Sequence, residues 1–133
     1  MIKNKQIVID FFIEAYNKKN YNYVMEYFSD DYIDHSPANA RSNKDAVGIL
    51  NIVHGMFPDI HVSIEDAIEE NGMVSIRAKF KGTQKGMFMN LEPTNKTIEW
   101  EALENFRLQD NIIVESWGFW PDLDMYKALG GKI

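Results

Sequence analysis

One histidine stands where it could move protons. His35 follows the short segment Tyr32–Asp34 and comes two residues before Pro37. An imidazole titrates at about pH 6.5, so His35 could act as a general acid or base at neutral pH. The same side chain could instead hold the turn between Asp34 and Pro37 by hydrogen bonds, and the sequence leaves both roles open.

A carboxylate interrupts the apolar side of the segment Ile98–Leu108. Glu104 shares its parity with Trp100 and Phe106, so an extended chain places it on the apolar face. Burying an unpaired carboxylate is costly, and such a group takes up a proton instead. Glu104 therefore either has a partner, such as His35, or lines a wet pocket. It could also lie beyond the edge of the core, or a bulge could shift the register.

A second acid, Asp122, follows Pro121 at the end of the last predicted strand. A bulge at Pro121 would let its carboxylate reach the mouth of a pocket, where a raised pKa would suit abstraction of an acidic C–H proton. Aspartate is also a favoured helix cap, and Asp122 could cap a short terminal helix instead.

Seven large side chains are candidates for the walls of an apolar pocket. Flat aromatic walls suit a planar ligand, although ordinary core packing is the alternative for each of them. The Tyr16 hydroxyl could also polarise a carbonyl oxygen, or it could reach solvent at the end of a helix. The candidates are Phe12, Tyr16, Met25, Trp100, Phe106, Trp117 and Phe119.

The first part of the chain, which must position these residues, has helical periodicity. Apolar residues recur at helical spacing between Ile7 and Tyr16, and a shorter helix is expected with Val24, Met25 and Phe28 on its buried side. After the short strand 32–34, a third helix should begin at Ser42, with Asp45 in a variant of the capping box, and end at Pro58.

After residue 58 the period changes to two. Apolar residues alternate with polar ones through 62–67 and 74–81, and Asn71-Gly72 between them indicates a tight hairpin turn. Two more strands are expected at 98–108 and 112–120, joined by Asp110-Asn111. Segregated helices and strands predict an α+β fold, in which a curved antiparallel sheet and N-terminal helices enclose a pocket. No linker divides the chain, so we expect a single domain over residues 1–133.

Several short motifs resemble one known family in their order and spacing. They are Asp34-His35-Ser36-Pro37, Phe57-Pro58-Asp59, Gly82-Thr83-Gln84-Lys85-Gly86-Met87-Phe88, Pro93-Thr94-Asn95-Lys96, Ile113-Val114-Glu115-Ser116-Trp117 and Leu129-Gly130. Together they resemble the SnoaL-like polyketide cyclases, also called ester cyclases, which have the nuclear transport factor 2-like fold. The resemblance runs from about Tyr32 to Gly130 without a gap.

The resemblance implies a cone-shaped α+β barrel, a homodimer, and ring closure by intramolecular aldol condensation without metal or cofactor. In that family an Asp near the end of the last strand shuttles the proton. The ungapped register places Pro121 at that position, with Asp122 one residue later. The histidine of the family's Gly-Thr-His motif is Gln84 in this chain.

The composition excludes other classes of function. The 133 residues carry a formal net charge of -6 and no cysteine, which disfavours nucleic-acid binding, disulfides and a thiol nucleophile. No metal-ligand spacing, signal sequence or membrane segment is found, so we expect a cytoplasmic protein.

Two functions stay open. One is a cofactor-independent enzyme that moves protons on a small apolar carbonyl compound, through His35, Asp122 and Glu104. The other is a non-catalytic ligand-binding or assembly domain of the same fold.

Overall fold

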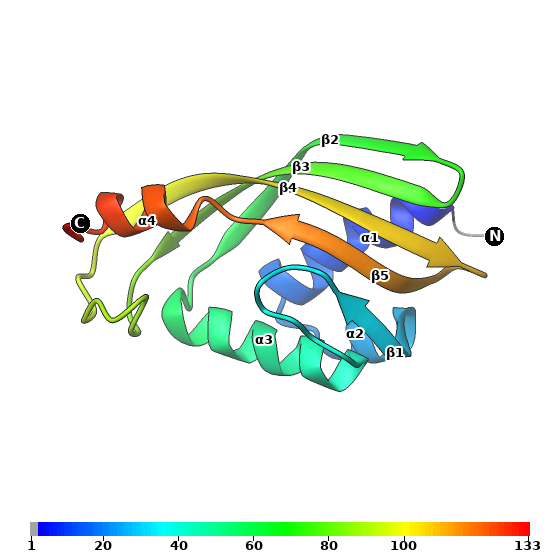
Figure 1. Ribbon diagram of the computed structural model, residues 1–133, viewed down its shortest axis with the longest axis horizontal. Coiled ribbons are helices and arrows are strands. Elements are labelled where there is room, and N and C mark those ends of the chain that lie inside the picture. The colour runs from blue at the N-terminus through cyan, green and yellow to red at the C-terminus, as the bar shows by residue number, and fades with distance from the viewer. Residues whose placement is uncertain (1–2) are drawn as a thin grey trace.

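The helices of the N-terminal half lie against one face of an arched sheet (Figure 1). The computed structural model describes residues 3–133. The elements in chain order are α1 (Asn4–Phe11), the π-helical segment η1 (Phe12–Asn17), α2 (Asn22–Tyr27), β1 (Phe28–Asp34), α3 (Asn43–Met56), β2 (His61–Glu70), β3 (Met73–Thr83), β4 (Thr97–Gln109), β5 (Ile112–Phe119) and α4 (Asp122–Ala128). This arrangement confirms the predicted α+β class. No helix within residues 3–133 combines the length and the apolar character that crossing a bilayer requires.

The sheet has five strands in the order β1-β5-β4-β3-β2. The four long strands β2 to β5 pair antiparallel, as expected, and β1 adds a fifth strand that runs parallel to β5. Register shifts interrupt the pairing in β1, β2 and between Arg107 and Leu108 of β4. Such bulges bend strands, which fits the arch that the sheet forms over α1 and α3 in Figure 1.

The alternation of side chains along β3 and β4 confirms the predicted period of two. Val74, Ile76, Ala78 and Phe80 are buried on the inner face of β3, and their neighbours are not. Both predicted hairpins also form. Asn71-Gly72 and Asp110-Asn111 have positive φ at both positions, the conformation of tight turns whose twist matches that of the strands.

The first helix contains a wide π-turn that the helical spacing of the sequence did not predict. Its buried side chains repeat every four residues, whereas an α-helix turns once in about 3.6 residues. Over two such steps an α-helix would rotate the later residues away from the sheet. The i→i+5 turn of η1, closed by the Lys18 N–H bond to Ile13 O at 3.1 Å, compensates for this drift. Tyr16 consequently faces the sheet. The buried residues are Ile7, Val8, Phe11, Phe12, Ala15 and Tyr16.

The capping pattern at the start of α3 is confirmed. The Ser42 hydroxyl accepts a hydrogen bond from the Asp45 N–H at 3.0 Å, and the Asp45 carboxylate accepts one from the Arg41 N–H at 3.0 Å. The expectation for the second helix was wrong in part. Phe28 has extended backbone and begins β1, and Met25 is 42% exposed, so Val24 alone of the three faces the core from this helix.

Candidate active site

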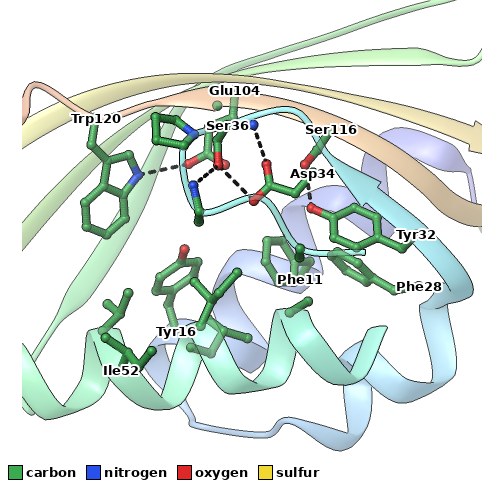
Figure 2. A pocket seen from close by; sticks show the side chains of 18 of the residues that line it. Phe11, Tyr16, Phe28, Tyr32, Asp34, Ser36, Ile52, Glu104, Ser116 and Trp120 are labelled. Carbon is green, nitrogen blue, oxygen red and sulfur yellow. Dashed lines mark hydrogen bonds between the residues drawn. The ribbon is translucent and has the colours of Figure 1, made fainter. Parts of the chain in front are cut away.

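A cavity of about 380 Å³ lies between the inner face of the sheet and α3 (Figure 2). One wall is apolar and comes largely from α3 through Ile49, Leu50, Val53 and Met56. The opposite wall comes from β1, the interior of β4 and the C-terminal half of β5, and it carries most of the polar groups. Four exposed lining residues form the mouth of the cavity, namely Pro37, Ala38, Ile52 and Asp122.

Glu104 projects from the inner face of β4 into this cavity, at the parity that the sequence predicted. Its Oε2 accepts a hydrogen bond from the Trp120 indole N–H at 3.3 Å. The residue opposite on β5 is Gly118, where a Cβ would stand 2.9 Å from the Glu104 Cγ and Oε1. Burial away from bulk water raises the pKa of Glu104 from 4.5 to about 7, and the nearby Asp34 carboxylate also acts to raise it. Glu104 can therefore both accept and release a proton near neutral pH.

Asp34 is a second carboxylate on the polar wall. Its two oxygens accept bonds of 2.8 Å from the Ser36 N–H and the Ser36 hydroxyl, which form a turn at the end of β1. The Arg41 guanidinium donates to the Asp34 backbone oxygen at 3.2 Å, not to its carboxylate. The two bonds from Ser36 hold the Asp34 carboxylate in place beside the cavity.

The Tyr16 hydroxyl is the polar group that faces Glu104 from the helical side. Its side chain is 8% exposed, and Figure 2 shows the oxygen pointing into the cavity toward the polar wall. This oxygen makes no hydrogen bond with any residue between 3 and 133. Burial, with the negative charge of Glu104, raises the pKa of Tyr16 well above its ordinary value, so the hydroxyl keeps its proton. A phenol in this position can donate a hydrogen bond to a bound oxygen.

A buried hydroxyl pair lies deeper in the cavity. Tyr32 Oη and Ser116 Oγ are 2.5 Å apart, one from β1 and one from β5. Burial raises the pKa of Tyr32 above its ordinary value. The pair therefore stays neutral and can present a polar group to a ligand without adding charge.

Asp122 lies at the mouth, at the first position of α4. Partial burial raises its pKa. The side chain does not cap the helix, because Pro121 precedes the helix and no side-chain cap bond is made. The structure thus brings Asp122 and Glu104 to one cavity, and their catalytic roles stay predictions.

The position expected for His35 was wrong, because this side chain lies outside the cavity. Its Nε2 is 2.8 Å from a Glu115 carboxylate oxygen, and its ring stacks on Trp117 with centroids 4.8 Å apart. Asp34 pairs with Ser116 and faces inward, so the next residue along the strand must face outward. His35 therefore joins β1 to β5 on the outer face of the sheet.

Three of the expected wall residues also point away from the cavity. Trp117 and Phe119 alternate with Ser116 and Gly118 on β5, and it is Ser116 and Gly118 that line the cavity. Phe119 is 62% exposed, and Met25 lies on the solvent side of α2. The alternation of side chains along β5 places Trp117 and Phe119 on the outer face of the sheet. The position of Met25 around the axis of α2 places it toward solvent.

Two further expected wall residues are core residues behind the wall. Phe12 is fully buried and stacks on Tyr16 at 5.8 Å. Trp100 stacks on Phe80 at 5.5 Å and packs against Trp120, which itself lines the cavity. Tyr16 and Phe106 are the expected wall residues that the structure places on the lining.

Three polar residues of the site, Asp34, Tyr32 and Ser116, were not predicted from the sequence. Asp34 and Tyr32 have the same parity on β1, and that pattern could have linked them to one face. No pattern indicated Ser116, because its neighbour Trp117 is more apolar and was therefore expected to face the pocket. Within the described part of the chain, no three His, Cys, Asp or Glu side chains are grouped closely enough to hold a metal ion.

The family model described as "SnoaL-like polyketide cyclase" matches residues 6–129. No curated protein matches the chain in sequence. Three solved structures illustrate the structural likeness. TsrD from Streptomyces laurentii has a TM-score of 0.89 and 17% identity, covering 99% of this chain and 100% of its own. A proposed SnoaL-like polyketide cyclase from a Jannaschia species has a TM-score of 0.88 and 19% identity, covering 98% and 93%.

IdmH from Streptomyces antibioticus, a proposed polyketide cyclase, has a TM-score of 0.86 and 24% identity, covering 97% of this chain and 99% of its own. Identities this low establish a shared fold, and reaction and substrate must be argued from the site. The family match covers nearly the whole chain, including the strands that carry the polar wall.

Proposed function

Because the chain belongs to the SnoaL-like polyketide cyclase family, we propose that it is an enzyme that transfers protons on a small, largely apolar carbonyl compound. The proton transfer would lead to ring closure or isomerisation in the cavity between the sheet and α3. The proposal rests chiefly on one observation. A glutamate with a pKa raised to about 7 faces a tyrosine hydroxyl that has no partner among residues 3–133, in a cavity whose other wall is apolar.

In the proposed step, ionised Glu104 takes a proton from the carbon beside the substrate carbonyl. The C–H electron pair moves into an enolate, and the Tyr16 hydroxyl donates a hydrogen bond to the enolate oxygen. For ring closure, the enolate carbon forms a C–C bond with a second carbonyl carbon of the same molecule. The π electrons of that carbonyl move to its oxygen, and the resulting alkoxide takes back the proton from Glu104. For isomerisation of a β,γ-unsaturated carbonyl compound, Glu104 returns its proton to the γ-carbon of the dienolate, and the double bond moves into conjugation with the carbonyl. Both outcomes are redox-neutral, so the chain's own side chains supply the proposed chemistry.

The other two acids have supporting roles in this proposal. Asp34 lies near Glu104 and raises its affinity for the proton. Asp122 lies at the mouth, where it could exchange protons with solvent or act as a second base toward a substrate that extends out of the cavity. A general base of this kind contributes about 10²- to 10⁴-fold to the rate.

The proposal can be tested without knowing the natural substrate. The two-ring ketone 2-tetralone exchanges its α-protons in D₂O, and proton NMR follows the exchange. We expect the protein to accelerate the exchange, with a rate that rises with pH through about 7 as Glu104 ionises. Glu104→Gln should reduce the acceleration by at least about 100-fold.

Glu99→Gln is a matched control on the same strand. Glu99 is exposed on the outer face of β4, so its replacement should leave the exchange rate unchanged. Unchanged exchange in Glu104→Gln would rule out this residue as the base. Binding of the ketone without any acceleration would favour the alternative, a non-catalytic ligand-binding domain.

A further inference from the structure

The cavity wall carries charge of one sign. Three carboxylates line it, Asp34, Glu104 and Asp122, whereas no Lys, Arg or His among residues 3–133 does so. The chain as a whole has 14 Lys and Arg and 3 His, so basic residues are available elsewhere. A bound carboxylate or phosphate would therefore meet three acids and no cation, which is unfavourable in a site shielded from water.

Most N–H and O–H groups of the polar wall already donate hydrogen bonds within the protein. The Trp120 indole N–H donates to Glu104, and both the Ser36 N–H and the Ser36 hydroxyl donate to Asp34. The Glu104 Oε1 has no donor within the described residues. The wall therefore offers a free acceptor to a ligand at Glu104, and the free donors of the cavity are hydroxyl groups rather than cations.

Tyr16 is an independent indication that a ligand completes this wall. Its side chain is more than nine-tenths buried, and its hydroxyl points into the cavity without a partner in the described chain. The hydroxyl opens onto the cavity, so its hydrogen-bond partner must be a molecule that occupies this space, either water or a bound ligand. The hydroxyl and the free Glu104 oxygen face the same volume (Figure 2).

Aromatic rings surround the same volume. Tyr16 and Trp120 lie with ring centroids 6.4 Å apart at one end, and Phe11, Phe28 and Phe106 pack together at the other. The negative faces of aromatic rings attract cations, most strongly where water is excluded. Rings and carboxylates together form the kind of site that binds ammonium groups.

We propose that the cavity selects its ligand by charge, and that the substrate is an aromatic or alicyclic carbonyl compound with a protonated amine rather than an acidic group. This inference names the substrate class of the proposed function, and it rests on that proposal for the cavity being the substrate site. The amine would lie against Asp34, near the charge of Glu104, so that the Glu104 carboxylate still faces the carbonyl as the base, and the apolar body of the ligand would lie against α3. The net charge of -6 favours the approach of such a cation.

The test compares three ligands with the same two-ring body, namely 2-naphthylmethylamine, 2-naphthalenemethanol and 2-naphthoate. Isothermal titration calorimetry at pH 8 and physiological salt gives their affinities. We expect the amine to bind at least about tenfold more tightly than the alcohol, and the carboxylate at least about tenfold more weakly. Equal affinities, tighter binding of the carboxylate, or no binding by any of the three would overturn the proposal.

Variants locate the effect in the cavity. Glu104→Gln should weaken amine binding at least about tenfold and change alcohol binding by less than about threefold. Asp122→Asn at the exposed mouth is a second variant that does not disturb the core, and it should weaken the amine alone. If Glu99→Gln on the outer face weakened the amine as strongly, a general surface charge effect would explain the selectivity, and the proposal would be wrong.

The pH dependence gives a further check. Asp34 and Tyr32 on β1, Tyr16 on η1 and Asp122 on α4 are the titratable groups that line the cavity with Glu104. Amine affinity should fall between pH 8 and pH 5.5 as Glu104 takes up its proton, while alcohol affinity stays nearly constant. An amine affinity that is constant over this range would contradict the proposal. These titrations measure binding and need no turnover. A failure of the ketone exchange test would therefore contradict the proposed proton transfer, whereas a failure of the ligand comparison would contradict the proposed selection by charge.

Discussion

Two glutamates eleven residues apart show how strongly the two faces of this sheet differ. Glu104 lies on the inner face of β4, where burial raises its pKa to about 7. Glu115 lies on the outer face of β5, where its hydrogen bond with His35, and another with Arg107, lower its pKa. The same side chain is thus a proton acceptor poised near neutrality on one face and an acid that is ionised at neutral pH on the other.

The comparison shows that solvation and partners decide what a carboxylate can do. Glu115 is partly exposed to water and has two cationic or hydrogen-bonding neighbours, so its charge is well stabilised. Glu104 has one weak donor, the Trp120 indole, and another carboxylate nearby. A site that leaves an acid poorly satisfied keeps it reactive, at a cost in stability.

The largest expected effect is on stability at alkaline pH, measured by urea unfolding of Glu104→Gln. The folded protein binds the Glu104 proton more tightly than the unfolded chain, so this residue reduces stability as pH rises from about 4.5 to about 7. At pH 8 the variant should be more stable than the wild type by up to about 3 kcal/mol. At pH 4 the two should be alike. A stability difference that does not change with pH would show that Glu104 is not desolvated.

An intermediate effect is expected for Gly118→Ala, which alters the Glu104 site from the neighbouring strand. The new Cβ would stand 2.9 Å from the Glu104 Cγ and Oε1, so the carboxylate must move. We expect a loss of about 1–2 kcal/mol in the free energy of unfolding and about tenfold slower ketone exchange.

Gly48→Ala is the matched control for that substitution. Gly48 lies on the exposed side of α3, and a Cβ added there would meet nothing within 4 Å. This variant should gain up to about 1 kcal/mol from helix propensity and keep full exchange activity. Equal behaviour of the two glycine variants would refute the view that Gly118 makes room for Glu104.

The smallest effect is expected on the outer face. Glu115→Gln weakens exposed ion pairs with His35 and Arg107, and such pairs contribute about 0.5 kcal/mol. The loss should shrink in high salt. It should also disappear in acid, as the pH falls through the pKa of Glu115, which lies below its ordinary value, because the wild-type and the variant side chains are then both neutral. Ketone exchange should not change, and a loss of exchange in this variant would make His35 and its partners catalytic candidates again.

Local patterns in the sequence were enough to predict the main elements of the fold. The period of two in β3 and β4, the turns at 71–72 and 110–111 and the Ser42 cap depend on neighbouring residues, and all of them form as expected. The same local reasoning found Glu104, because an acid in an apolar strand pattern is visible without the tertiary structure. The π-turn of η1 was missed because helical spacing alone does not reveal a widened turn.

The tertiary structure alone decided which side chains share the cavity. Asp34 and His35 are adjacent, and the pairing of Asp34 with Ser116 across β1 and β5 turned the first inward and the second outward. Trp100 and Glu104 share one face of β4, yet Trp100 is packed behind Trp120, whereas Glu104 opens into space below the sheet. The sequence determined the alternation along each strand, because that is a property of the extended backbone. Strand register and the distance of α3 from the sheet depend on contacts between distant segments, and these contacts set where the core ends and the cavity begins.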